Sequence, residues 1–384
     1  MKKIAAGIIG MGFIGGSHIE ALRRIGFVKL AAVADAVPEQ ARRKAEEFSV
    51  PCCYDNVEAL LANPDIEVVH NCTPNNLHFE INKKIIQANK HVFSEKPLGR
   101  YSSESEQMLK LLAEHPSVVS GVNFCYRMNP LVMEIKNQIK KGAIGKPVLV
   151  HGSYLQDWLL YDDDYNWRID PEISGPSRCV ADIGSHWIDL AQTVINSKIV
   201  EVCADTLITH PIRKKAMGVV ESFARNKSDN YEEICVTTED YATVLVRFAN
   251  GVRGHFTCSQ ISAGRKCRLD IEINGKEGSY YWNQENSDVA WKGNRDTNNE
   301  VVMRNPNLMD PSVRPYTYLP AGHPEGWNDA QRNNLFAFYK FIADGKNTRE
   351  DSCDFATFEE AHYIMKITEA ILKSAKEKRW ISVE

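Results

Sequence analysis

Three glycines, Gly10, Gly12 and Gly15, follow a short apolar run in the pattern Gly-x-Gly-x-x-Gly. In this pattern the first glycine permits a tight turn, the second lets the backbone approach a pyrophosphate, and the third lets a helix pack closely on a strand. The N-terminus of the helix that follows offers free N–H groups and a partial positive charge to phosphates. The pattern therefore predicts a dinucleotide site, with Phe13 and Ile14 among its contacts.

Asp35 lies at the end of the next apolar run, Val28–Asp35. An acid at this position accepts hydrogen bonds from the adenosine ribose hydroxyls and repels a 2′-phosphate. No arginine follows it directly, so the sequence favours NAD over NADP. The alternative is that the glycines form an ordinary turn and that Asp35 caps a helix.

Polar segments follow two further predicted strands: Thr73-Pro74-Asn75 with His78, and Glu95-Lys96-Pro97. Open parallel sheets bind ligands beyond the carboxyl ends of their strands, so both segments are expected in the same crevice as the cofactor. A lysine there could donate a hydrogen bond to an oxygen that becomes a carbonyl. The alternative is a surface lysine that simply follows a strand.

Asp182 and His186 stand four residues apart at the start of a predicted helix, Ile183–Ile195. On an α-helix this spacing places them about 40° apart around the axis. A histidine can take the proton of a hydroxyl while a hydride leaves. The spacing alone favours a simpler interpretation, a capping aspartate and a structural histidine.

Strands and helices alternate through the first 124 residues. The predicted strands are Lys3–Ile9, Val28–Asp35, Cys52–Tyr54, Ile66–Cys72, His91–Ser94 and Val118–Phe124. The predicted helices are His18–Ile25, a helix that opens at Pro38, Val57–Leu61, Leu77–Ala88 and Ser102–Glu114. This alternation predicts a doubly wound parallel sheet with helices on both faces.

The pattern changes beyond residue 124. Longer, half-polar strands are expected at Ile199–Thr209, Glu233–Ala249, Gly254–Ser259, Arg268–Asn274 and Gly278–Trp282. Helices are expected at Pro130–Lys141, Ile183–Ile195, Asn333–Ala343 and Phe355–Glu377, and a long loop at Asn283–Pro320. Hairpin turns such as Asn250-Gly251 favour a mostly antiparallel sheet with one solvent-exposed face. This pattern predicts a second α/β domain.

The 384 residues carry 46 Lys and Arg against 50 Asp and Glu, a formal net charge of −4. No basic block stands out, so nucleic-acid binding is not expected, and no cluster has metal-ligand spacing. The ten cysteines form no Cys-x-x-Cys pair, which favours a reducing compartment. The apolar start Ile4–Ser17 resembles a secretory signal, but glycines interrupt it and it is too short to span a bilayer. We therefore expect a cytoplasmic protein that does not associate with membranes.

Together the glycine pattern, the Thr-Pro-Asn-x-x-His segment, Glu-Lys-Pro and Asp-Ile-Gly-Ser-His resemble the Gfo/Idh/MocA oxidoreductase family over essentially the whole chain. The resemblance implies an NAD-binding Rossmann domain over residues 1–124. It implies a substrate-binding and oligomerisation domain over residues 125–384, of α/β type with a large open sheet. A homodimer or homotetramer is expected on this basis.

The resemblance also assigns roles to the motifs. It implies that Lys96 is the catalytic lysine and that Asp182 and His186 complete a triad. Glu95 and the Thr73–Asn75 turn are expected near the nicotinamide end of the cofactor. Weaker family patterns match three further segments: Asn123 with Arg127, Trp167-Arg168, and His323-Pro324-Glu325. Asn123, Trp167 and Arg168 are expected at the cofactor, and Arg127, Trp167, His323 and Glu325 at the substrate.

The loop between Gln156 and Arg168 mixes aromatic residues with acids. Aromatic faces stack on the C–H faces of a sugar while acids accept from its hydroxyls, although the loop could equally pack on its own domain. The expected activity is NAD-dependent, reversible oxidation of a ring secondary hydroxyl of a pyranose or glycoside, with C3 as the expected position. The alternatives are an inositol dehydrogenase, an NAD-dependent glycosidase that acts by oxidation and elimination, and a non-catalytic sugar or dinucleotide sensor.

Overall fold

The computed structural model describes residues 3–216 and 230–384 of the chain. The chain forms two compact units. Unit 1 contains Met1–Met128 and Asn328–Tyr363, and unit 2 contains Asn129–Trp327 and Ile364–Glu384. The chain therefore returns to unit 1 after residue 327, whereas the sequence suggested a single boundary at residue 124.

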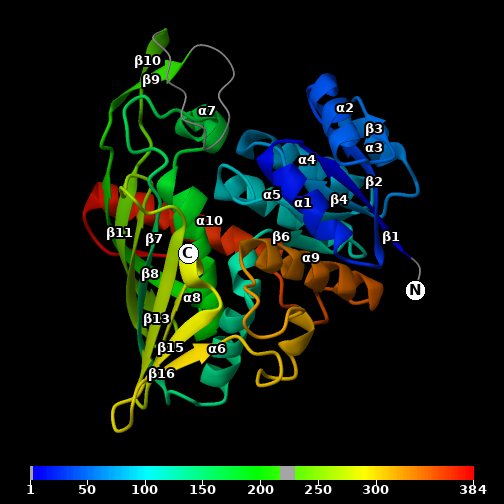
Figure 1. Cartoon of the computed structure of the whole chain (residues 1–384). Helices are drawn as coiled ribbons and strands as arrows, with labels where there is room; N and C mark the ends of the chain where they lie inside the picture. Colours follow the sequence, from blue (N-terminus) through cyan, green and yellow to red (C-terminus); the bar gives the residue numbers. More distant parts are fainter. Residues whose placement is uncertain (1–2, 217–229) are drawn as a thin grey trace. The chain divides into compact units, whose positions relative to one another are not determined.

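The described part of unit 1 contains a parallel sheet of six strands in the order β3-β2-β1-β4-β5-β6 (Figure 1). Its strands are β1 (Ile4–Ile9), β2 (Val28–Ala34), β3 (Cys53–Tyr54), β4 (Val68–Asn71), β5 (His91–Ser94) and β6 (Ser120–Val122). Its helices include α1 (Phe13–Arg23), α2 (Pro38–Glu47), α3 (Val57–Ala62), α4 (Asn75–Gln87), α5 (Ser102–Glu114) and α9 (Trp327–Ala343). This strand order is that of a doubly wound dinucleotide-binding sheet, so the predicted fold class is confirmed for this half.

Helix α1 begins at Phe13, earlier than the predicted start at His18. Gly12 is the residue that caps its N-terminus, and Gly15 and Gly16 lie inside its first turns. Glycine is a poor helix former, so the apolar spacing becomes visible only further along. The helix N-terminus, with its free N–H groups, therefore follows the glycine turn directly.

The described part of unit 2 contains a sheet of nine strands in the order β16-β15-β14-β13-β7-β12-β11-β8-β17. The strands are β7 (Pro147–Leu155), β8 (Ile199–Leu207), β11 (Tyr241–Phe248), β12 (Arg253–Ser259), β13 (Arg268–Gly275), β14 (Ser279–Asn283), β15 (Val289–Gly293), β16 (Glu300–Met303) and β17 (Ile381–Ser382). Every pairing in this sheet is antiparallel except β7 with β12. The predicted large, mostly antiparallel sheet is confirmed.

One face of this sheet is covered by helix α8 (Ser185–Ile195), while α6 (Pro130–Lys140) and α10 (Phe358–Glu377) are further long helices of the chain. The Trp187 ring of α8 stacks on Phe256 of β12 with 4.6 Å between ring centroids, and its Nε1 donates to the Asp270 carbonyl at 3.1 Å. A Cβ on Gly152 of β7 would lie 2.7 Å from this Nε1. The close packing of α8 on the sheet therefore requires glycine at position 152.

Two sequence predictions in unit 2 are wrong. The single strand expected over Glu233–Ala249 is two strands, β10 (Tyr231–Cys235) and β11, because the residues before β11 turn polar side chains into a buried cluster. β10 pairs with β9 (Ile212–Ala216) in a separate small sheet. The long loop expected over Asn283–Pro320 contains β15 and the edge strand β16, which are only five and four residues long and lie among polar residues.

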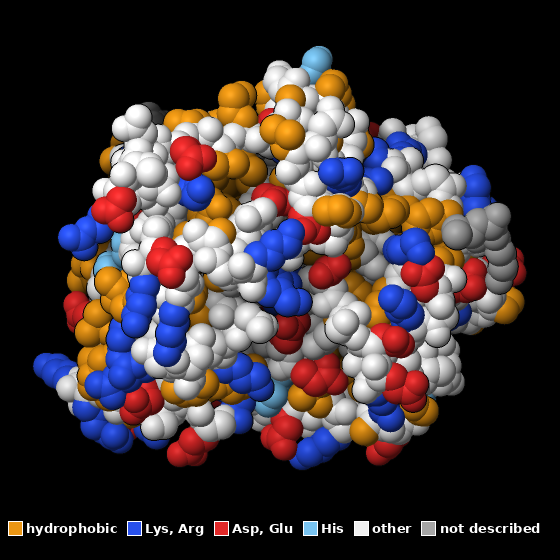
Figure 2. Space-filling model, turned by 90° about the horizontal axis from the view of Figure 1, so that it is seen from below, with side chains coloured by type: hydrophobic (Ala, Val, Ile, Leu, Met, Phe, Trp, Pro, Cys, Tyr) orange, Lys and Arg blue, Asp and Glu red, His pale blue; other side chains and the backbone are white. Residues whose placement is uncertain are grey.

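Other features of the described residues bear on the class of protein. None of the described helices is long and apolar enough to cross a membrane. The same residues contain no group of three His, Cys, Asp or Glu side chains that could hold a metal ion. All ten cysteines lie within the described ranges as free thiols. On the face shown in Figure 2, both Lys and Arg side chains and Asp and Glu side chains are exposed, with several Lys and Arg side chains close together on its left.

Candidate active site

The glycines of the turn in unit 1 differ in the space around them. The fold has no room for a side chain at Gly10 or Gly15, but it leaves open space at Gly12. Gly10 has φ +93°, and a Cβ there would lie 2.6 Å from the Cys72 backbone. A Cβ on Gly15 would lie 2.2 Å from the Gly10 carbonyl oxygen. A Cβ on Gly12 would have no described atom within 4 Å apart from those of its neighbours along the chain. The open space at Gly12, at the N-terminus of α1, is the place where a pyrophosphate would approach the backbone.

This difference gives a matched pair of variants. Gly12→Ala should change stability by only about 0.5 kcal/mol, as an exposed substitution does, while weakening NAD binding at least about tenfold. Gly15→Ala should instead destabilise the fold by about 1–3 kcal/mol because its Cβ overlaps backbone. Thermal unfolding and an NAD titration of both variants measure the two effects. Normal NAD affinity in Gly12→Ala would show that the cofactor does not use this turn.

Asp35, directly after β2, is tied to the glycine turn rather than to a helix end. Its Oδ2 accepts from the Met11 backbone N–H at 2.6 Å, and its Oδ1 accepts from the Val37 N–H at 2.9 Å. Helix α2 begins after Val37 without a side-chain cap, so the helix-capping alternative is wrong. The carboxylate therefore sits where the sequence placed a ribose-binding acid.

Glu95 and Lys96 follow β5, and the structure brings Glu95 together with Asn123. Glu95 is buried, and its Oε1 accepts from Asn123 Nδ2 at 2.5 Å and contacts His18 Nε2 at 2.9 Å. The Lys96 backbone N–H donates to Glu95 Oε2 at 3.3 Å. Burial opposes ionisation of Glu95, but the hydrogen bonds from His18 and Asn123 outweigh it and lower its pKa. A fixed carboxylate therefore lies beside the candidate catalytic lysine.

Behind Glu95 runs a buried chain of hydrogen bonds that the sequence did not predict. His18 Nδ1 lies 2.8 Å from His70 Nδ1, and His70 Nε2 lies 2.8 Å from the Tyr339 hydroxyl. One set of tautomers satisfies all the contacts: Tyr339 donates to His70, His70 donates to His18, and His18 donates to Glu95. Burial lowers the pKa of His70 well below its ordinary value, in keeping with its accepting role at Nε2.

His78, predicted at the cofactor, lies between two turns of unit 1. Its Nδ1 lies 2.6 Å from the Pro97 carbonyl and its Nε2 lies 2.8 Å from the Thr73 carbonyl. Both ring nitrogens therefore face backbone oxygens. This geometry gives His78 a positioning role: it joins the Thr73–Asn75 turn to the segment that carries Lys96.

Asp182 of unit 2 lies in a π-helical turn, Val180–Gly184, that leads into α8. The expectation of a regular α-helix from Ile183, with Asp182 as a possible cap, is wrong. Asp182 Oδ1 pairs with Arg168 Nε at 3.3 Å, and Oδ2 accepts from Gln260 Nε2 at 3.0 Å. π turns recur at functional sites, and here the turn presents a carboxylate held from two sides.

His186 and the Trp167-Arg168 segment lie in the same unit. His186 is buried in the first turn of α8, with its ring centroid 6.0 Å from that of Tyr154. The Arg168 guanidinium lies over the Trp167 ring, 4.4 Å from its centroid. The structure therefore joins Trp167 to Asp182 through Arg168, a link that the sequence predictions did not contain.

The aromatic loop packs largely on its own unit, as the alternative interpretation proposed. Trp158 and Tyr165 lie against a buried cluster of Leu159, Ile169 and Val236. Arg213 of β9 reaches the loop from the side. Its guanidinium donates to three loop carbonyls, those of Leu159 at 2.9 Å, Tyr161 at 2.7 Å and Asp164 at 3.1 Å. Tyr161 is the exposed aromatic side chain of this stretch.

The weaker predicted substrate contacts have structural partners of their own. Glu325 is buried, and its Oε1 accepts from the Leu319 N–H at 2.9 Å and pairs with Arg304 at 3.2 Å. These contacts anchor the loop that carries it, whereas the His323 side chain is exposed. Arg127 is buried in unit 1 and pairs with Glu360 at 3.1 Å. The contacts of Glu325 and Arg127 thus favour structural roles over substrate binding.

Two family models match the chain. Residues 4–124 match the oxidoreductase family with an NAD-binding Rossmann fold, and residues 132–281 match the GFO/IDH/MocA C-terminal domain. The chain belongs to the Gfo/Idh/MocA oxidoreductase family. It is therefore an NAD-dependent oxidoreductase, and the open space at Gly12 with the adjoining Asp35 fits this cofactor.

Two relatives that match this chain over its full length are named as sugar dehydrogenases. Levoglucosan dehydrogenase of Pseudarthrobacter phenanthrenivorans is 29% identical over 405 residues, covering 100% of this chain and 99% of the relative. Glucose-6-phosphate 3-dehydrogenase of Bacillus subtilis is 26% identical over 385 residues, with the same coverage. A solved structure of levoglucosan dehydrogenase with NADH and levoglucosan is 28% identical, with a TM-score of 0.87 and full coverage of both chains.

Proposed function

We propose that this enzyme oxidises a ring secondary hydroxyl of a pyranose or glycoside to a ketone, reversibly and with NAD, with C3 as the expected position. The observation that carries the proposal is the Asp182 carboxylate, held between Arg168 and Gln260 one helical turn before His186. A histidine one turn from a fixed carboxylate supports this reaction, because the histidine can take a proton while the carboxylate orients the hydroxyl. Full-length similarity to two sugar dehydrogenases supports the substrate class.

Each candidate residue has a defined task in this proposal. When bound, NAD⁺ supplies the hydride acceptor. His186 takes the hydroxyl proton on a ring nitrogen, and Lys96 donates a hydrogen bond to the oxygen as it becomes a carbonyl. Asp182 accepts from the substrate and fixes its orientation. In the reverse direction His186 returns the proton to the same oxygen.

Two finer expectations belong to the proposal. We propose a homodimer or homotetramer that forms on the open face of the nine-stranded sheet, where Leu149, Leu207 and Leu245 are exposed. Light scattering of the purified chain tests this assembly, and a monomeric mass would contradict it. We also propose a cytoplasmic location, because a reducing compartment would keep all ten cysteines as thiols.

An inositol dehydrogenase is the second candidate, because it too would oxidise a secondary hydroxyl on a six-membered ring. Inositol 2-dehydrogenase of Salmonella typhimurium is 27% identical, but the match covers 50% of this chain. The sugar dehydrogenases match over the whole chain, so a pyranose substrate is preferred.

The test is NAD⁺ reduction, followed by absorbance, across monosaccharides, glycosides, anhydrosugars and inositols. We expect turnover on pyranoses or glycosides and its loss in His186→Ala. Product analysis identifies the oxidised carbon. NAD binding without reduction of any substrate would contradict the dehydrogenase and leave the NAD-dependent glycosidase and the sensor. Turnover confined to inositols would decide for the second candidate.

A further inference from the structure

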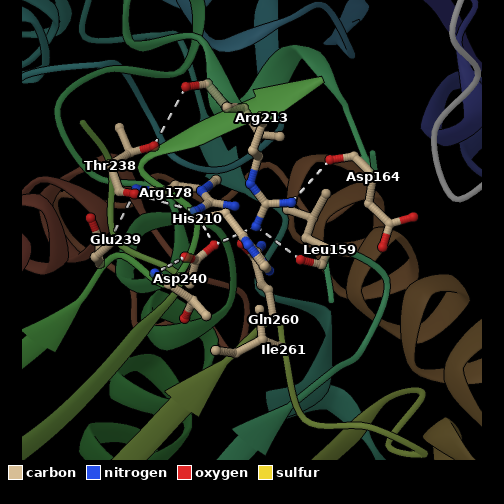
Figure 3. Close-up of polar contacts among 12 residues, drawn as sticks. Leu159, Asp164, Arg178, His210, Arg213, Thr238, Glu239, Asp240, Gln260 and Ile261 are labelled. Carbon is tan, nitrogen blue, oxygen red and sulfur yellow. Dashed lines mark hydrogen bonds and ion pairs between the residues drawn. The ribbon is translucent and has the colours of Figure 1, made fainter. Parts of the chain in front are cut away.

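A buried carboxylate lies at the centre of a polar cluster in unit 2 (Figure 3). Asp240, just before β11, binds two arginines through Oδ1: Arg178, and Arg213 Nη2 at 2.8 Å. All three side chains are fully buried. Asp240 Oδ2 accepts from the Thr209 backbone N–H at 2.6 Å. Three fixed contacts of this kind leave the Asp240 carboxylate one position, so it can serve as a rigid anchor.

Two routes lead from this anchor to Asp182. Along the first, Arg178 binds Asp240 with its guanidinium and accepts from the Asp182 backbone N–H at 2.8 Å with its carbonyl. Along the second, the Gln260 backbone N–H donates to the Asp240 carbonyl at 3.0 Å, and Gln260 Nε2 donates to Asp182 Oδ2 at 3.0 Å. The backbone and the carboxylate of Asp182 are therefore both tied to Asp240.

The orientation of the Gln260 amide is determined by its partner. An ionised carboxylate only accepts hydrogen bonds, so Nε2 and not Oε1 must face Asp182. Gln260 Oε1 is then buried and has no hydrogen-bond partner among the described residues. A buried acceptor without a partner destabilises a fold. Fold stability therefore does not explain why an amide side chain is present at position 260. Its hydrogen bond to the Asp182 carboxylate does explain it.

We propose that Gln260 is a positioning residue that fixes Asp182 Oδ2, so that the carboxylate keeps its orientation toward substrate through the reaction. The inference rests on the proposed function, because it takes the role of Asp182 from there. The charged or titratable groups around this carboxylate and its anchor include Arg168, Arg178, His186, Arg213, Glu239, Asp240, Asp164 and Cys179. Among the side chains that bind the Asp182 carboxylate, Gln260 is a neutral donor, beside the cationic Arg168.

Two substitutions of similar size separate positioning from packing. Gln260→Met removes the donor at every pH. Gln260→Glu places a carboxyl group against Asp182, where like charges raise its pKa, and only its protonated form can donate to Asp182. Relative to wild type at the same pH, we expect Gln260→Met to lose at least about tenfold in kcat throughout. Gln260→Glu should lose as much near pH 8 and recover toward wild type as the pH falls to about 6.

Further measurements separate the possible outcomes. NAD affinity should stay unchanged in both variants, and Gln260→Met should be at least as stable as wild type because it removes the unpartnered oxygen. Gln331→Glu is the matched control, since Gln331 is a buried glutamine of unit 1 whose side-chain nitrogen and oxygen have no described hydrogen-bond partner. Its kcat per folded molecule, relative to wild type, should show no recovery in acid.

Two results would overturn the inference: a kcat of Gln260→Met equal to wild type, or equal losses in both Gln260 variants at every pH. Asp182→Asn distinguishes this failure from failure of the proposed function. If Asp182→Asn is inactive while the Gln260 variants behave as wild type, the role of Gln260 alone is wrong. If Asp182→Asn turns over sugar as fast as wild type, or if no form of the enzyme turns over any sugar, the proposed function itself is wrong.

Discussion

Replacing Lys96 by methionine should lower kcat for sugar oxidation by about 10³-fold, or about 4 kcal/mol of transition-state stabilisation. Methionine keeps an unbranched stem but removes the charge and the three N–H donors that would hold the oxygen as it becomes a carbonyl. Glu95 keeps its contacts with His18 and Asn123 in this variant. The loss should therefore appear in kcat, while NAD affinity, measured by titration, stays within about threefold.

Lys84→Met is the matched control for this prediction. Lys84 lies on α4 of the same unit and pairs with Glu58 at 2.7 Å on the surface. Exposed pairs of this kind contribute little, so kcat should equal that of wild type. A Lys96→Met enzyme that keeps more than about a tenth of wild-type kcat would show that another group supports the developing carbonyl.

Replacing Asp240 by asparagine should destabilise unit 2 by about 3–5 kcal/mol. The change leaves two fully buried arginines, Arg178 and Arg213, without the carboxylate that both of them bind. Glu239 lies beside them, but burial raises its pKa and its Oε1 already accepts from Ser177 and backbone N–H groups. For a unit of this size the loss corresponds to a fall of about 10 °C in Tm.

Asp162→Asn provides the comparison for Asp240→Asn. Asp162 also pairs with a cation, Lys214 at 2.8 Å, but both side chains are partly exposed to solvent. Water replaces such a contact at small cost, so the unfolding curve should hardly move. Denaturant unfolding followed by tryptophan fluorescence measures both variants. Equal curves for the two would mean that the Arg178–Asp240–Arg213 cluster does not stabilise unit 2.

The sequence predicted those parts of the fold that depend on neighbours along the chain. Strand β5 at His91–Ser94 and helix α5 at Ser102–Glu114 have the predicted bounds, because apolar runs and helical spacing are local signals. The break between β10 and β11 depends instead on Asp240 and its partners Arg178 and Arg213, 62 and 27 residues away. Tertiary contacts of this kind override the local β-pattern.

The same distinction applies to the candidate site. The glycine turn is contiguous in sequence, so its residues could be predicted from spacing alone. Gln260 and Asp182 are 78 residues apart, and His70 and Tyr339 are 269 apart. The available signal was a polar residue at the inward position of an apolar segment, such as His70 in β4. That signal indicates a buried partner without saying which residue it is.

The return of residues 328–363 to unit 1 limits how this enzyme can be recombined with its relatives. Helix α9 supplies Tyr339 to His70 and Asn334 to the Asn123 side chain, and Phe338 lies against Phe93 with 5.0 Å between ring centroids. A chimaera that exchanged only the N-terminal segment would have a complete nucleotide-binding motif. The α9 residues behind Glu95 would then come from a different protein than the residues they contact. A chimaera that exchanges the whole of unit 1 must therefore exchange two segments, residues 1–128 and 328–363. The second of these segments carries no recognisable cofactor motif of its own.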